Sequence, residues 1–226
     1  MMKSKIFLFI ITAIILNSCG VQRATRSVAY KQLYEEKNHS ILILPPINRS
    51  TKVEAKEIFY SSLVSPLAER GYYVMPPLLS MAILKEESAY DAEMFLNNSM
   101  KNVGTLFGTD AVLFTIIHDW SKTTIASQIR VNIEYILKST KTDEIIFQRK
   151  GNITLTRKSS GSGGLSALIE LAANMAATAL TNEIVAGRQC NYYTLSDLPA
   201  GKYHPQFQQD GEIISGEKEF NVVLTY

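Results

Sequence analysis

Hydrophobic positions in this chain repeat either every second residue or at helical spacing, and the clearest repeat covers residues 125–137. There the odd-numbered positions are mostly apolar and the even-numbered positions mostly polar. A period of two predicts a strand with one covered face and one solvated face. A polar turn at 139–143 leads into a second such segment, residues 144–156, so the two segments predict an antiparallel hairpin. Gly151 interrupts the apolar face and is expected at a β-bulge.

Shorter apolar segments predict the other strands. Residues 40–44 (SILIL) are followed by two prolines and predict a buried first strand, and residues 72–75 predict a second. Residues 111–117 (AVLFTII) are apolar on both alternating sets of positions, which predicts a central strand covered on both faces. Residues 220–226 (FNVVLT with a final tyrosine) predict a last strand.

Helical spacing predicts three segments between these strands. Thr51 and Glu54 form a capping-box pattern at the start of the first helix, and Gly71 is expected to end it. Residues 78–85 predict a short helix. Residues 91–107 predict one or two more.

The longest helix is predicted over residues 165–185. Its polar positions recur every fourth residue and form a narrow stripe, so most of its circumference is expected to be covered. Its alanines would let another backbone approach closely. Ala172 and Ala176 are therefore candidate contacts of a homodimer, with the free edge of a strand as the alternative.

The order β-α-β-α-β-β-β-α predicts an α/β (α+β) fold. It consists of a single mixed β-sheet that contains the antiparallel hairpin, with helices packed on it.

The first 18 residues have the pattern of a lipoprotein signal peptide. Lys3 and Lys5 precede an apolar segment of 11 residues, 6–16, which is too short to span a bilayer and is typical of a signal peptide. Leu16-Asn17-Ser18-Cys19 follows, which is a lipobox pattern. We therefore expect cleavage before Cys19, lipidation of its thiol, and attachment to a membrane through the acyl chains.

Cleavage changes the charge and the cysteine count. It removes Lys3 and Lys5, so that 21 basic residues face 21 acidic ones, and this neutral balance gives no case for nucleic-acid binding. Once Cys19 is lipidated, Cys190 has no partner within the chain. We expect Cys190 to be buried, with pairing between chains as the alternative.

The predicted organisation has four parts. Residues 1–18 are the signal peptide, 19–38 the lipidated N-terminus and a polar tether, 39–210 the α/β domain, and 211–226 a tail that contains the last strand.

Candidate chemistry is sparse. The glycine-rich segment 161–164 lacks the spacing of a phosphate-binding loop or of a serine-hydrolase elbow, and the three histidines, His118 among them, do not form a metal-ligand array. We therefore expect no catalytic residues, no metal and no cofactor. Tyrosines beside prolines suggest a protein-binding surface, with packing at the edge of the core as the alternative. The candidate positions are Tyr72, Tyr73, Tyr203 and His204.

Four segments together resemble a family of bacterial lipoproteins of unassigned function, which includes a meningococcal vaccine-candidate lipoprotein. They are SILILPPINRS (40–50), PLAERGYYVMPP (66–77), GTDAVLFTII (108–117) and KYHPQF (202–207). The resemblance covers residues 39–210. It implies a domain similar to the amino-terminal domain of TolB and related to curli-secretion-type lipoproteins. It also implies a periplasm-facing protein that is accessory to a transporter or secretion assembly and is dimeric, with no catalytic residues to transfer. Residues 211–226 match no part of it.

The sequence as a whole predicts a non-enzymatic envelope lipoprotein that docks a partner protein. The alternative is a lipid-anchored binding protein for a small envelope ligand. Gly20 follows the lipidated cysteine, where an aspartate would signal retention in the inner membrane, so we expect the outer membrane, with the domain facing the periplasm.

Overall fold

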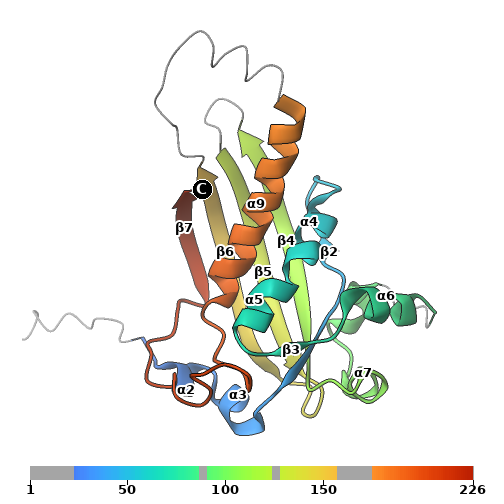
Figure 1. Ribbon diagram of the computed structural model, residues 1–226, viewed down its shortest axis with the longest axis vertical. Coiled ribbons are helices and arrows are strands. Elements are labelled where there is room, and N and C mark those ends of the chain that lie inside the picture. Colours follow the sequence, from blue (N-terminus) through green and yellow to red (C-terminus); the bar gives the residue numbers. More distant parts are fainter. Residues whose placement is uncertain (1–22, 87–90, 124–127, 157–174, 226) are drawn as a thin grey trace, which may run out of the picture.

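One mixed sheet organises the domain (Figure 1). The computed structural model describes residues 23–86, 91–123, 128–156 and 175–225. The strands are β1 (Ser40–Ile43), β2 (Ile47–Asn48), β3 (Tyr73–Val74), β4 (Ala111–Thr123), β5 (Gln128–Ser139), β6 (Ile145–Thr156) and β7 (Glu219–Thr225). Their order is β3-β1-β4-β5-β6-β7, with β2 also paired to β4. The pairs β4–β5 and β5–β6 are antiparallel and the others parallel, so the predicted mixed sheet is confirmed.

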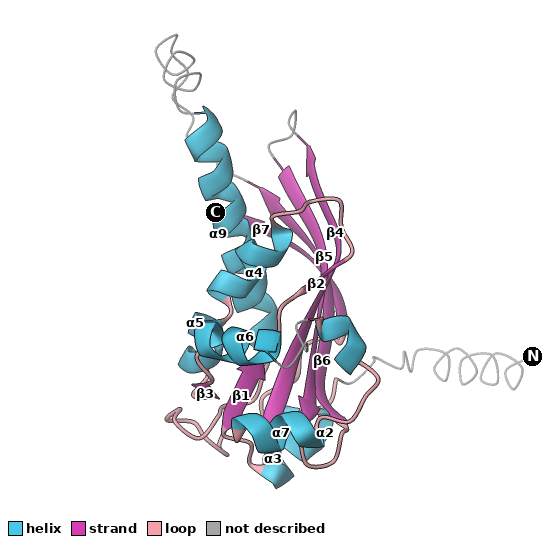
Figure 2. Cartoon of the chain, turned by 90° about the vertical axis from the view of Figure 1, so that its right-hand side faces the viewer, coloured by secondary structure: helices cyan, strands magenta, loops and turns pink. Residues whose placement is uncertain are grey.

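Helices pack on both faces of the sheet. They are α2 (Arg26–Ala29), α3 (Lys31–Glu36), α4 (Ala55–Ser62), α5 (Val64–Glu69), α6 (Pro77–Glu86), the 3-10 helix η1 (Ala92–Phe95), α7 (Lys101–Phe107) and α9 (Met175–Leu195). Figure 2 shows α4, α5 and α9 together on one side of the strands. Helices α6 and α7 contribute to a second hydrophobic cluster on the other face.

Strand β4 separates the two hydrophobic clusters. Leu113 and Ile117 belong to the larger one, which also contains residues of α4, α5 and α9, whereas Val112 and Phe114 belong to the smaller one with α6 and α7. The prediction of a central strand covered on both faces is confirmed. The alternation predicted for the hairpin is confirmed as well, because the odd-numbered residues of β5 from Ile129 to Leu137 are all buried in the larger cluster.

The long helix continues past its predicted end, and its predicted start at 165 lies outside the described residues. Helix α9 runs from Met175 to Leu195, so the prediction that it ends at Val185 is wrong. Gly187, which was expected outside the helix, lies within it. A Cβ atom at Gly187 would be 2.5 Å from Cγ2 of Ile58, so this glycine permits the close packing of α9 on α4.

Two local predictions are also wrong. Helix α4 begins at Ala55 and has no side-chain cap, so Thr51 and Glu54 do not form a capping box. Gly151 is not at a bulge, because it pairs in regular register with Ile133. A Cβ atom at Gly151 would be 2.3 Å from Cζ of Phe220, so the glycine makes room for an aromatic ring of β7.

Both ends of the described chain belong to the domain. Arg26, Tyr30 and Leu33 are buried, so the predicted tether of residues 19–38 is too long. The tail expected at 211–226 is part of the sheet, because β7 pairs in parallel with residues 150–156 of β6. The predicted last strand is thereby confirmed.

Candidate functional site

A buried network of charged side chains fastens the N-terminal helices to the chain that follows α9. The guanidinium of Arg26 donates from Nη1 to Oδ2 of Asp210 at 3.0 Å and from Nε to Oδ1 of Asp197 at 3.3 Å. Tyr30, one turn further along, donates its hydroxyl to Asp197. These residues are buried, so the charges are paired where they are largely shielded from water.

Asp210 is the centre of this network. Besides Arg26, its carboxylate accepts from Nη2 of Arg70 at 3.1 Å, from the hydroxyl of Tyr34 at 2.8 Å and from the amide of Ala200 at 2.9 Å. Burial pushes the pKa of Asp210 upward, but these hydrogen bonds and the two guanidinium charges outweigh it and hold the pKa below its ordinary value. Asp210 therefore stays ionised and joins α2, α3 and α5 to one loop.

Arg149 of β6 extends the network toward β7. Its Nε donates to the carbonyl of Glu217 at 3.1 Å and its Nη1 to the carbonyl of Thr194 at 2.9 Å. Its guanidinium also lies 4.4 Å from the ring centre of Phe220. The start of β7 and the end of α9 are thus held by one side chain.

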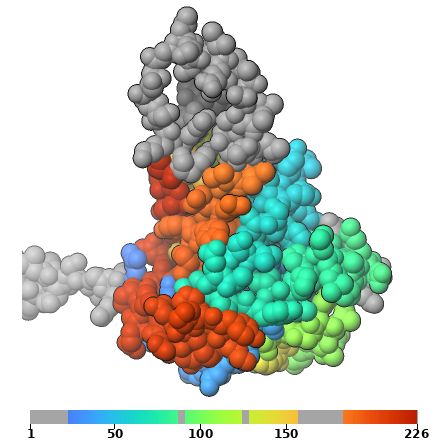
Figure 3. All heavy atoms as spheres, viewed as in Figure 1, coloured from blue at the N-terminus to red at the C-terminus, as the bar shows by residue number. Residues whose placement is uncertain are grey.

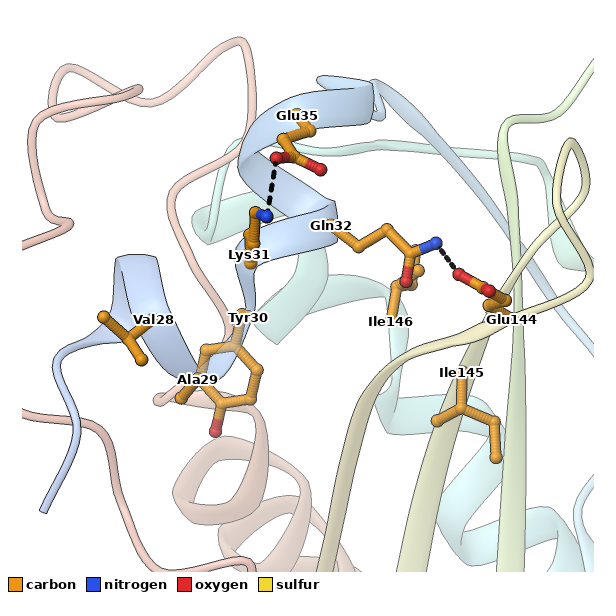
Figure 4. Close-up of a pocket in the computed structure, with 9 residues that line it drawn as sticks. All are labelled: Val28, Ala29, Tyr30, Lys31, Gln32, Glu35, Glu144, Ile145 and Ile146. Carbon is orange, nitrogen blue, oxygen red and sulfur yellow. Dashed lines mark hydrogen bonds and ion pairs between the residues drawn. The ribbon is translucent and has the colours of Figure 1, made fainter.

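A groove runs between the N-terminal helices and the start of β6 (Figure 4). The first part has a volume of about 330 Å³, and an adjoining part of about 260 Å³ continues past residues 215–218. Both parts are lined by Ala29, Tyr30, Ile145 and Ile146. The groove borders a strand edge, because β7 pairs with β6 only from Lys150 onward and no other described strand pairs with residues 145–149 on that side.

The polar side chains of the groove are already paired with one another. Lys31 lies 3.4 Å from Glu35, and Gln32 donates to Glu144 across the groove, as the dashed lines in Figure 4 show. A small polar ligand would have to displace these contacts. The groove is thus poorly suited to a compact charged molecule.

The tyrosines predicted as an interface lie near one another, but not all are at the surface. The amide of Tyr203 donates to the carbonyl of Gly71 at 2.9 Å, so the loop 201–204 runs beside the start of β3, and Figure 3 shows the chain after α9 next to α5. Tyr73 is 52% exposed and Tyr203 is 65% exposed. Tyr72 is buried and donates its hydroxyl to the carbonyl of Pro199, so its place in the predicted interface is wrong.

His204 has a structural contact as well as partial exposure. A Cβ atom at Gly71, whose φ is +81°, would be 2.3 Å from the amide nitrogen of His204, so the close approach of the turn after α5 to this loop requires glycine at position 71.

Two leucines at the start of α6, Leu78 and Leu79, are 88% and 58% exposed. We call the exposed set Tyr73, Leu78, Leu79 and Tyr203 the tyrosine edge.

The other predicted positions have different outcomes. Cys19 and Ala172 lie outside the described residues. Ala176 lies in α9, and its side chain is also outside the described part. Cys190 is unpaired and fully buried, as expected, and burial raises the pKa of its thiol.

His118 lies in a small polar cluster on the sheet. Its Nε2 is 2.9 Å from Oε2 of Glu134, whose other oxygen accepts from Nε2 of Gln148 at 2.5 Å. Within the described ranges, no group of three or more His, Cys, Asp or Glu side chains is arranged to hold a metal ion. In the same part of the chain, no helix has the length and apolar character needed to cross a bilayer.

Sequence reasoning missed the charged network completely. Arg26 and Asp210 are 184 residues apart, and neither belongs to a local motif. Only the meeting of the two chain ends in the fold makes them neighbours. The one available signal was the presence of charged residues such as Arg26 in the segment expected to be a tether, where a charged residue is ordinarily solvated.

Comparison with known proteins gives a consistent set of relatives. The family model described as "Putative lipoprotein GNA1162-like" matches residues 28–196. The curated protein "Putative lipoprotein NMB1124/NMB1162" of Neisseria meningitidis serogroup B is 28% identical over 169 residues, which cover 74% of this chain and 78% of that protein.

Solved structures with similarity include lipoprotein GNA1162 from Neisseria meningitidis, at 24% identity and a TM-score of 0.47, covering 66% of this chain and 99% of that one. The PelC dodecamer from Paraburkholderia phytofirmans is 13% identical with a TM-score of 0.42, covering 74% and 91%. The C-terminal domain of LpoB from Salmonella enterica is 15% identical with a TM-score of 0.39, covering 56% and 93%.

The family model spans most of the chain, from α2 to the end of α9, and its description agrees with the resemblance found in the sequence. This chain belongs to the GNA1162-like lipoprotein family.

Proposed function

We propose that this protein is a lipid-anchored, non-catalytic accessory lipoprotein of the cell envelope that docks another envelope protein. Cys19 is the lipidated residue in this proposal, and the domain faces the periplasm from the outer membrane. The observation that carries the proposal is membership in a lipoprotein family together with a lipobox pattern ending at Cys19.

The tyrosine edge is the docking surface we propose. Tyrosine side chains are well suited to interfaces because they combine a large apolar area with a hydroxyl group and few rotatable bonds. Tyr73 lies on β3, which is the end strand of the sheet, and Leu78 is the most exposed large apolar side chain described. Large exposed apolar side chains near the end strand of the sheet favour contact with a protein over contact with a small ligand.

A small envelope ligand is the second candidate, and the groove beside α3 is its site. Taken separately, the two parts of the groove, of about 330 and 260 Å³, lie close to the lower limit of roughly 300 Å³ for ligand pockets. The internal pairing of Lys31 with Glu35 and of Gln32 with Glu144 leaves few polar groups in the groove to orient a ligand. We therefore rank this function below docking.

Photo-crosslinking in cells tests the docking proposal. A photoreactive amino acid at Tyr203 should give a crosslinked product with one envelope protein, and the same residue at Val53, which is 79% exposed on another part of the fold, should not. The substitution Leu78→Glu should remove the product while the protein stays in the membrane fraction, and Val53→Glu should leave it unchanged.

Three outcomes would contradict the proposal. Equal yields of crosslinked product with the photoreactive residue at position 203 and at position 53 would show random contact. A product that survives Leu78→Glu would place docking elsewhere. Turnover of a substrate by the purified protein would contradict the non-catalytic assignment.

A further inference from the structure

We infer that the surface formed by α2 and residues 211–218 lies against the phospholipid bilayer, so that the domain is held in one orientation. We call this surface the N-terminal face; its exposed members include Arg23, Val28, Glu212, Ile213, Ile214, Glu217 and Lys218. The inference rests on the proposed lipidation of Cys19 and adds to it an orientation that lipidation alone does not give.

The fold begins very close to the anchor. The carbonyl of Ala24 accepts from the amide and the hydroxyl of Ser215, both at 2.9 Å. The next residue, Thr25, forms a β-bridge with Ile214, and the amide of Arg26 donates to the carbonyl of Ile213 at 2.8 Å. The chain is therefore fixed to the domain from Ala24 onward.

The charged network prevents this attachment from opening. The side chain of Arg26 is buried and bound to Asp197 and Asp210. If α2 were released to lengthen the tether, the buried carboxylates of Asp197 and Asp210 would lose the guanidinium of Arg26. Leaving buried charges without their partner is strongly unfavourable. The tether is thus limited to the residues before Ala24.

The reach of that tether is shorter than the domain. Five residue steps separate Cys19 from Ala24. At full extension they span at most about 17 Å. A globular chain of about 200 residues has a radius of gyration of about 16 Å, which for a solid sphere corresponds to a diameter of about 41 Å, more than twice the length of the tether. The side that bears α2 must then face the bilayer, whereas the end of β4, which Figure 1 places at the opposite end of the domain from α2, cannot reach it.

The chemistry of the N-terminal face suits a zwitterionic lipid surface. Val28 is 69% exposed and Ile214 is 55% exposed, on neighbouring segments of the chain. The charges around them are mixed, and Arg23 is paired with Glu217 at 3.0 Å. Apolar side chains at the level of the headgroups, without a net positive patch, give a contact that depends on the lipid anchor and on apolar burial rather than on anionic lipid.

Fluorescence quenching in vesicles tests the orientation. The full lipidated protein carries a single bimane label at Val28→Cys or Ile214→Cys and is reconstituted in phosphatidylcholine vesicles that contain brominated phosphatidylcholine. Matched controls carry the label at Val53→Cys, just before α4, or at Leu78→Cys, at the start of α6; both positions are exposed, and Figure 1 draws these helices away from α2. Cys190 is fully buried, so it should not react with the label.

We expect several-fold stronger quenching at positions 28 and 214 than at 53 and 78. A flexible Gly-Ser insertion of about 20 residues after Gly20 should abolish the difference, because such a tether spans roughly 25–30 Å. Equal quenching at all four positions, in protein that floats with the vesicles, would overturn the orientation and leave lipidation intact. Protein that does not float would overturn the lipid anchor itself. A blue shift at position 28 that rises with protein concentration before vesicles are added would show that a second copy covers this face, and would also overturn the inference.

Discussion

Replacing Asp210 by alanine is expected to lower the free energy of unfolding by about 3–5 kcal/mol, the range for removing one partner of a buried ion pair. The carboxylate is fully buried and accepts from Arg26, Arg70, Tyr34 and the amide of Ala200. Alanine would leave two guanidinium groups without their shared counter-charge. That loss, rather than the loss of packing, accounts for most of the expected change.

Urea denaturation of the chain without its lipid, followed by circular dichroism, measures this change. The matched control is Arg49→Ala, which breaks the exposed pair with Glu93 at 2.7 Å and should cost less than about 1 kcal/mol. Asp210→Asn keeps the shape and loses the charge, so it should fall between the two. If Asp210→Ala changed stability by no more than Arg49→Ala, the assignment of the network as the fastening of the two chain ends would be refuted.

Three further predictions follow from single contacts. Gly187→Ala would place a Cβ atom 2.5 Å from Ile58 and should destabilise the domain by about 1–3 kcal/mol in thermal unfolding. Gly151→Ala meets the ring of Phe220 and should speed amide exchange in β7, with Phe220→Leu restoring protection in the double variant. The free energy of unfolding should fall as the pH is lowered through about 4 and below. The pKa of Asp210 is lower in the folded protein than in the unfolded chain, so the ionised carboxylate stabilises the fold and protonation removes that stabilisation. Asp210→Asn should flatten this pH dependence.

The strands of the sheet could be predicted because each has a periodic local signal. The alternation from Ile129 to Leu137 specifies which face of β5 is buried, and the doubly apolar AVLFTII segment specifies a strand between two cores. Such patterns depend only on neighbouring residues, so no knowledge of distant contacts was needed.

The wrong predictions involve contacts between distant segments. In the sequence, Gly187 is typical of the end of a helix. In the fold, α9 contacts Ile58 at this position, and the packing requires a residue without a side chain there. Gly151 interrupts an apolar face and therefore predicts a bulge, but in the fold its lack of a side chain makes room for the ring of Phe220. Tyr72 resembles a surface tyrosine, yet its hydroxyl reaches the carbonyl of Pro199 within the core.

For the candidate surfaces as well, local features could be predicted and features that depend on distant contacts could not. Exposure of Tyr73 and Tyr203 agrees with their polar and proline-rich surroundings. The short reach from Cys19 to the domain could not be predicted, because it depends on the bond between Ala24 and Ser215, which are 191 residues apart. A segment that looks like a tether becomes part of the domain once its charged residues find buried partners.

Mass spectrometry of the N-terminal peptide, from protein purified out of the membrane fraction of the cells that make it, tests the lipid anchor. We expect a peptide that begins at Cys19 and carries a diacylglycerol group, with the mass of the added acyl chains lost in Cys19→Ser. An unlipidated peptide that begins at any other residue would contradict the lipid anchor and, with it, the orientation of the domain.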